Sequence, residues 1–196
     1  MNKGLIVLLS IVGILVISGL SLMGSYNDLV KLDEQVKQSW SQVENVYQRR
    51  LDLIPNLVET VKGYATHEKE TYIAVTEARS KAAGTISPDV INDPAKFKAF
   101  QDSQIALSSA IARLLVTVEN YPNLKANENF LSLQAQLEGT ENRISVERGR
   151  FNESAQIFNT KIRQLPTSII ANMFGFNKKE YFKADEGAKE APKVMF

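Results

Sequence analysis

The chain has 196 residues, with 23 Lys and Arg against 22 Asp and Glu, one histidine and no cysteine. This balance of charge creates no overall field that would attract a nucleic acid, so we expect no nucleic-acid partner. The absence of cysteine excludes disulfides and thiolate sites, and a single histidine excludes a histidine-rich metal centre.

The N-terminal segment is apolar and uncharged from Gly4 to Met23. As a helix it is long enough to cross the roughly 30 Å hydrocarbon core of a bilayer. A cleaved signal peptide would have a shorter apolar run and a clear small-residue cleavage site, and the residues around Ser18 offer only weak candidates. A lipoprotein signal would need a cysteine. We therefore predict an uncleaved transmembrane anchor over residues 1–24, in contact with membrane lipid, in preference to a cleaved signal or a buried core helix.

Positive charges near the anchor hardly distinguish its two orientations. Lys3 and the α-amino group precede the apolar run, whereas Lys31 and Lys37 follow it. A short basic leader usually stays in the cytoplasm, so the pattern slightly favours an extracytoplasmic body.

Apolar residues at steps of three, four and seven predict a first helix over residues 26–51. Nothing between Met23 and Tyr26 breaks a helix, so we expect it to continue from the anchor. Pro55 predicts a kink or turn, with Asp52 as the N-cap of a second helix that ends near Gly84.

Residues 84–94 are the clearest loop in the chain. A third helix is predicted from its apolar stripe, in which Gln104 occupies one position, and it should end before Pro122. A fourth helix, with a near-heptad pattern typical of a coiled coil, is predicted over residues 130–165. The expected fold is all-α: the transmembrane helix followed by an antiparallel four-helix bundle of long helices over residues 25–176.

The fourth helix contains polar residues at positions that should face the interior, where charge is costly unless it is paired. Two interpretations remain open: an internal polar network that sets the helix register, or a contact surface for a partner. The arginine-rich junction at residues 49–59 has the same two interpretations. The candidate residues are Arg49, Arg50, Asp52, Asn56, Glu59, Glu141, Asn142 and Arg148.

The C-terminal part begins with a short amphipathic stretch from Thr167 that contains Ile169, Met173 and Phe174. Such a helix either caps the end of a bundle or lies at a membrane surface, and we favour capping. An even number of helices after the anchor returns the chain to the anchor end. Residues 177–196 are expected to form a flexible tail, because the composition after Asp185 is typical of disorder.

Several sequence strings resemble the LemA family of bacterial membrane proteins, and the resemblance covers nearly the whole chain. They are YNDLV at 26–30, RRLDLIPNLVETVKGYA at 49–65, ENYPNLK at 119–125, LEGTEN at 137–142 and FGF at 174–176. One departure is at residues 149–152, where the family more often has Ala-Arg and Tyr-Asn. The resemblance implies an N-terminal anchor and a four-helix, bromodomain-like bundle.

The same resemblance implies a role in the bacterial envelope. The family has no established enzymatic activity, and its members are often encoded near membrane metalloproteases. We therefore expect a single-pass protein of the inner membrane that acts as a scaffold or adaptor, in contact with copies of itself or with other envelope proteins. One alternative is a regulatory partner of a membrane protease or chaperone.

Enzyme chemistry has few candidate residues in this sequence. His67 lies beside Glu68, but a zinc-protease pair needs a second histidine on the same face. A carboxylate-metal enzyme is a weaker alternative, because the paired Glu-x-x-His units of such bundles are absent. We expect no catalytic, cofactor-binding or metal-binding residues.

Overall fold

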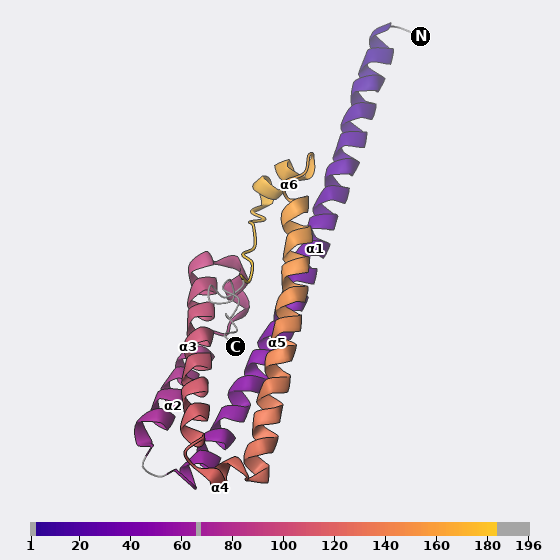
Figure 1. Ribbon diagram of the computed structural model, residues 1–196. Coiled ribbons are helices and arrows are strands. Elements are labelled where there is room, and N and C mark those ends of the chain that lie inside the picture. The colour runs from indigo at the N-terminus through magenta and orange to yellow at the C-terminus, as the bar shows by residue number, and fades with distance from the viewer. Residues whose placement is uncertain (1–2, 66–67, 184–196) are drawn as a thin grey trace, which may run out of the picture.

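The computed structural model describes residues 3–65 and 68–183, and over these residues it is helical without strands (Figure 1). Its elements are α1 (Lys3–Lys62), α2 (Lys69–Ala83), the 3-10 helix η1 (Pro88–Asn92), α3 (Pro94–Val118), α4 (Pro122–Lys125), α5 (Glu128–Lys161) and α6 (Thr167–Phe174). The predicted all-helical class is confirmed.

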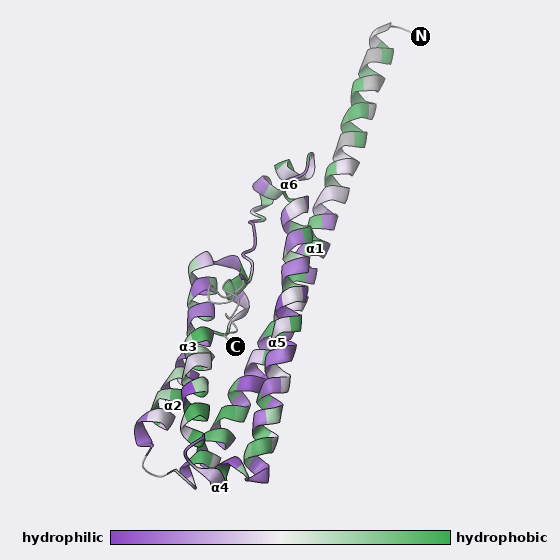
Figure 2. Cartoon of the chain, viewed as in Figure 1, coloured by the Kyte–Doolittle hydropathy of each residue, from purple (hydrophilic) through white to green (hydrophobic). Residues whose placement is uncertain are grey.

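Helix α1 contains 60 residues, which corresponds to a length of about 90 Å. Its apolar N-terminal part stands clear of the other elements (Figure 2). Side chains such as Ile14 and Leu15 are exposed. Among the described residues this is the helix that is long and apolar enough to cross a membrane. The anchor and the first helix are continuous, as expected.

The turn predicted at Pro55 is wrong, because α1 continues to Lys62. Proline has no N–H to donate to the carbonyl of Leu51, four residues earlier in the helix. Arg79 of α2 supplies the missing donor, since its Nε donates to the Leu51 oxygen at 2.8 Å. Asp52 does not cap a helix; its carboxylate accepts a hydrogen bond from Gln48 at 2.8 Å.

The chain turns instead after Lys62, so the predicted second helix is divided between the end of α1 and α2. Helix α2 ends at Ala83 with Gly84 as its C-cap, close to its predicted end. The predicted loop contains η1, and Asp93 then caps α3 by accepting hydrogen bonds from the N–H groups of Ala95 and Lys96.

The long helices form two antiparallel pairs. Helix α5 packs along α1, and α3 packs along α2, which also contacts α1. The backbones of α3 and α5 come close at few points, so one edge of the arrangement is open (Figure 1). This open edge is where the candidate site lies.

The core consists of two clusters that follow one another along the helices. The span-proximal cluster, nearer the apolar part of α1, is rich in aromatic residues, among them Trp40, Phe100 and Phe151. The distal cluster is mainly aliphatic, with Leu51, Leu107 and other branched side chains.

After α6 the chain turns back, and residues 176–183 run without regular secondary structure alongside α5 (Figure 1). Within this C-terminal segment, Lys179 and Phe182 are buried. Residues 177–183 therefore pack against the helices rather than forming part of a flexible tail. The rest of the predicted tail, residues 184–196, lies outside the described residues.

Candidate functional site

The C-terminal segment, residues 176–183, is held to α5 by two asparagine side chains. Asn159 donates to the carbonyl of Lys179 at 2.9 Å and accepts from its N–H at 2.8 Å. Asn152 makes the same pair of bonds with Phe182, both at 2.9 Å. Each carboxamide thus satisfies both backbone groups of one residue.

The spacing of these contacts describes the path of the segment. Asn152 and Asn159 are two helical turns apart, or about 10.5 Å along α5. Lys179 and Phe182 are three residues apart, which span about 10 Å only when the chain is nearly extended. Helix α5 therefore holds this extended part of the chain by pairing asparagine carboxamides with the backbone groups of the segment.

Phe182 fills the space between α3 and α5 in the span-proximal half. Its ring lies 5.0 Å from that of Phe97 and 5.6 Å from that of Phe151, and it stacks on Trp40 at 6.2 Å. The guanidinium of Arg148 lies 4.8 Å from the same ring, and its Nη2 donates to the carbonyl of Lys183. The segment is thus an integral part of the aromatic core.

Lys179 also connects the segment to α1 and η1. Its buried ammonium lies 2.9 Å from a carboxylate oxygen of Asp33 and donates to Oδ1 of Asn92 at 2.7 Å. Burial alone would raise the pKa of Asp33, but hydrogen bonds from Lys179 and Lys37 outweigh it and hold that pKa below its usual value. Asp33 is therefore charged in the folded protein at neutral pH.

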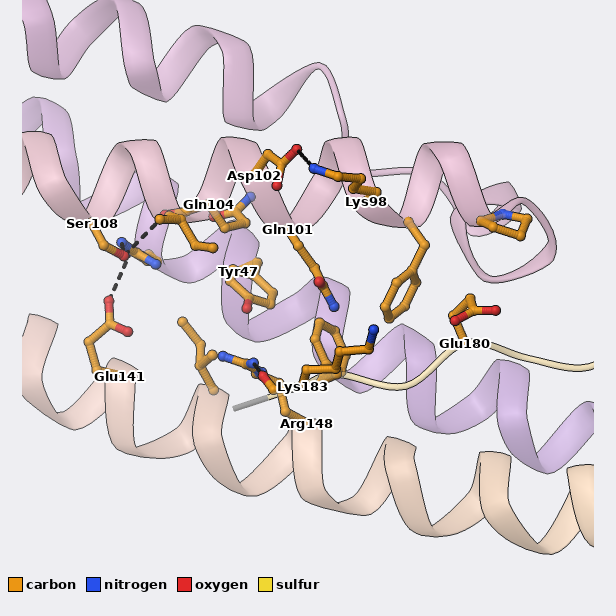
Figure 3. A pocket seen from close by; sticks show the side chains of 16 residues that line it. Tyr47, Lys98, Gln101, Asp102, Gln104, Ser108, Glu141, Arg148, Glu180 and Lys183 are labelled. Carbon is orange, nitrogen blue, oxygen red and sulfur yellow. Dashed lines mark hydrogen bonds and ion pairs between the residues drawn. The ribbon is translucent and has the colours of Figure 1, made fainter. Parts of the chain in front are cut away.

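Beside Phe182, a groove of about 1150 Å³ lies between α3 and α5 (Figure 3). Tyr47 and Arg50 of α1 line it, together with residues of the other two helices. Glu180, Phe182 and Lys183 of the C-terminal segment also contribute to its lining. The other principal lining residues are Lys98, Gln101, Asp102, Gln104, Ile105 and Ser108 of α3, and Glu141, Ile144 and Arg148 of α5.

Arg50 is the buried charge of this groove. Its Nη2 donates to Oγ of Ser108 at 2.6 Å, and its Nε lies 3.0 Å from a carboxylate oxygen of Glu141. Burial lowers the pKa of Arg50, and the negative charge of Glu141 opposes that shift. Arg50 therefore joins α1, α3 and α5 across the groove, because its two partners lie on different helices.

Gln104 is the most unusual side chain of the groove. It is 4% exposed, and among the described residues neither its Oε1 nor its Nε2 has a hydrogen-bond partner. The nearby Nε2 of Gln101 is also buried without a partner there, and this side chain points from α3 into the groove (Figure 3). A buried polar group without a partner costs about 1–3 kcal/mol, so these two carboxamides are the unsatisfied hydrogen-bonding groups beside the groove.

The structure brings three of the eight candidate residues to the groove: Arg50, Glu141 and Arg148. The other five lie on exposed helix surfaces away from it: Arg49, Asp52, Asn56, Glu59 and Asn142. Of these, Glu59 pairs with Lys62 at 2.6 Å. Of the candidates in the groove, Arg50 and Glu141 pair across two helices, and Arg148 bonds to the C-terminal segment.

Sequence reasoning did not select Gln104 as a functional residue, although a polar residue in the apolar stripe of α3 was a usable signal. It also missed Asn152, Asn159 and Lys179, whose partners lie far away in the chain. His67 lies outside the described residues. Its neighbour Glu68 accepts a hydrogen bond from the hydroxyl of Tyr121 at 3.1 Å.

Comparison with known proteins matches residues 39–196 to a family described as the LemA family. The chain belongs to the LemA family. The matched region includes every residue of the groove and the C-terminal segment, and it begins within α1 after the apolar part.

Two relatives illustrate this membership. The magnetosome protein MamQ of Magnetospirillum gryphiswaldense is 27% identical over 179 residues, which cover 83% of this chain and 66% of the relative. Protein LemA of Metamycoplasma hominis is 27% identical over 164 residues, covering 84% and 71%. The chain thus spans just under two thirds of the length of the MamQ relative. Neither name is that of an enzyme.

Proposed function

We propose that this LemA-family chain is a non-enzymatic adaptor, anchored in the membrane by residues 4–23, whose groove holds an extended segment of a partner protein. In this proposal α1, α2, α3 and α5 act as a four-helix bundle that is open along its α3–α5 edge. The observation that carries the proposal is the buried, unpaired carboxamide of Gln104 in the groove.

The C-terminal segment supports this choice of ligand. Asn152 and Asn159 already bind an extended chain by its backbone N–H and C=O groups. Gln104 and Gln101 supply the same chemical group farther along the same space between α3 and α5. A partner polypeptide would satisfy them in the same way, with little dependence on its side chains.

The continuity of α1 supports the anchoring part of the proposal. Tyr47 and Arg50 line the groove and belong to the same unbroken helix as the apolar segment. Twenty-four residues separate Met23 from Tyr47, which places the groove about 36 Å from the end of that segment. Tethering in a membrane raises effective concentration, so a weak contact with a neighbouring envelope protein or with a second copy would suffice.

The test is photo-crosslinking in intact cells. A benzophenone amino acid replaces Ile105, which is 52% exposed and lines the groove, or Ile157, which is 50% exposed on α5 outside it. We expect a discrete crosslinked product from position 105 and none from position 157. Mass spectrometry then identifies the captured chain as another envelope protein or as a second copy.

A second variant separates partner binding from folding. Gln104→Leu keeps the size of the side chain but removes its donor and acceptor, so we expect the product from position 105 to disappear while circular dichroism stays unchanged. Equal crosslinking from positions 105 and 157, or a product that survives Gln104→Leu, would overturn the proposal.

A further inference from the structure

Helix α6 is apolar on two faces, and only one of them is covered. Thr167, Ile170 and Ala171 are buried against the rest of the molecule. The other face leaves Ile169 and Met173 exposed, and Leu165 and Phe174 beside them are exposed as well. Contiguous apolar side chains on a surface mark a contact with another molecule or with lipid.

The position of this patch indicates which of these covers it. The ring of Phe174 lies 4.7 Å from that of Tyr26 on α1, and the ring of Phe176 lies 6.0 Å from it. Tyr26 is three residues, or about 4.5 Å, beyond Met23, the last residue of the apolar segment. The patch therefore lies at the level where the apolar segment ends (Figure 1).

Helix α1 is continuous from the apolar segment past Tyr26, so no break separates that segment from the level of the patch. Insertion of residues 4–23 into a bilayer therefore also fixes the height of α6 at the boundary between acyl chains and headgroups. Membrane interfaces favour basic and aromatic residues. Exposed Arg163 precedes α6 in the chain, exposed Lys178 follows it, and the aromatic Tyr26 lies beside it on α1.

We propose that residues 165–174 are a membrane-contact element that places Leu165, Ile169, Met173 and Phe174 in the lipid surface beside the anchor. This inference rests on the insertion of residues 4–23, which is part of the proposed function. The protein then touches the membrane at two points, and the second point fixes the tilt of the body and the direction in which the groove faces.

The test uses the full chain in vesicles of phosphatidylethanolamine and phosphatidylglycerol. The protein has no cysteine, so single-cysteine variants can be labelled with a nitroxide without further changes. Met173→Cys, at a position 72% exposed, probes the patch. Val116→Cys, at a position 65% exposed near the far end of α3, is the matched control, and Ile14→Cys reports on the anchor.

The measurement is the collision rate of each label with oxygen, which prefers lipid, relative to a nickel chelate, which prefers water. We expect the oxygen-to-nickel ratio at position 173 to be several-fold higher than at position 116 and lower than at position 14. Near-ultraviolet circular dichroism should be the same for all three variants, because each replaced side chain is exposed.

Three other results would overturn the inference, each in a recognisable way. A ratio at position 173 equal to that at position 116, with position 14 deep in lipid, would remove the lipid contact and leave the anchor intact. A label at position 14 in water would remove the anchor itself, and with it the proposed function. Spin–spin broadening between labels at position 173 would show that a second copy covers the patch.

Discussion

The space between α3 and α5 has two stretches that differ in what fills them. In the span-proximal half the C-terminal segment fills that space, and Phe182 contacts aromatic rings from three helices. From Phe182 toward Ser108 and Glu141 the same space is the groove, whose lining includes many polar side chains. The open edge is thus closed by a peptide segment along one stretch and left accessible along the other.

The polar groups of the two stretches differ in the same way. The carboxamides of Asn152 and Asn159 each have backbone partners, whereas that of Gln104 has none among the described residues. Carboxamides thus lie along both stretches of the α3–α5 edge, and an extended chain pairs with those of Asn152 and Asn159.

The largest effect is expected from Phe182→Ala, which empties the centre of the aromatic cluster. Phe182 is 7% exposed, and its removal should lower the free energy of unfolding by about 4 kcal/mol. Thermal unfolding followed by the near-ultraviolet signal of Trp40 measures this loss. Val116→Ala, at an exposed position, is the control and should unfold with the parent protein. An unchanged transition in Phe182→Ala would show that the segment does not seal this half.

The second effect concerns Asp33 and depends on pH. Asp33→Asn leaves the buried Lys179 ammonium without its counterion and should cost about 3 kcal/mol at pH 7. The folded pKa of Asp33 lies below its usual value of 3.8, so this stability is present above pH 3.8 and is lost as pH falls toward the folded pKa. Denaturant unfolding at pH 7 and pH 3 measures this. The difference in free energy of unfolding between the parent protein and Asp33→Asn should be smaller at pH 3.

Asp102→Asn serves as the control for this pH dependence, since the carboxylate of Asp102 pairs with Lys98 on an exposed face. Its stability should follow that of the parent at both values of pH. If the difference in free energy of unfolding between the parent and Asp33→Asn is the same at pH 7 and pH 3, the role assigned to the Asp33–Lys179 pair is contradicted.

A smaller loss is expected from Asn159→Ala, which removes both hydrogen bonds to the backbone of Lys179. About 2 kcal/mol should be lost, because the N–H and C=O of a buried residue are left without partners. Hydrogen exchange at the Lys179 amide measures this directly and should become faster than in the parent. Asn142→Ala, an exposed position on the same helix, is the control and should leave that amide protected.

The helices were largely predictable from sequence because the spacing of apolar residues reports which face of each helix is buried. The exception was Pro55, where the local rule of a lost donor is correct but a distant residue compensates for it. Arg79 lies 28 residues from Leu51, whose free carbonyl it satisfies, and no local pattern contains that contact. A break predicted from proline is therefore reliable only where no such donor reaches the helix.

The site was predictable only in part, for a related reason. Arg50, Glu141 and Arg148 stand out in the sequence as charges within helical segments, and all three line the groove. Lys179 and Phe182 did not stand out, because the composition near them resembles a tail. What buries them is the double pairing with Asn152 and Asn159, which depends on the return of the chain along α5.

The smallest effect has the opposite sign and tests the groove itself. In a sealed core, replacing a hydrogen-bonded glutamine by leucine is destabilising, whereas Gln104 has no partner to lose among the described residues. Gln104→Leu should therefore raise the free energy of unfolding of the isolated protein by about 1 kcal/mol, because it removes the cost of burying an unpaired carboxamide. Asn159→Leu, with a similar change of chemistry in the sealed half, should lower it. A stabilised Gln104→Leu protein that also loses its crosslinked partner would mean that this glutamine is kept for binding, whereas a destabilised one would place Gln104 in the core as a structural residue.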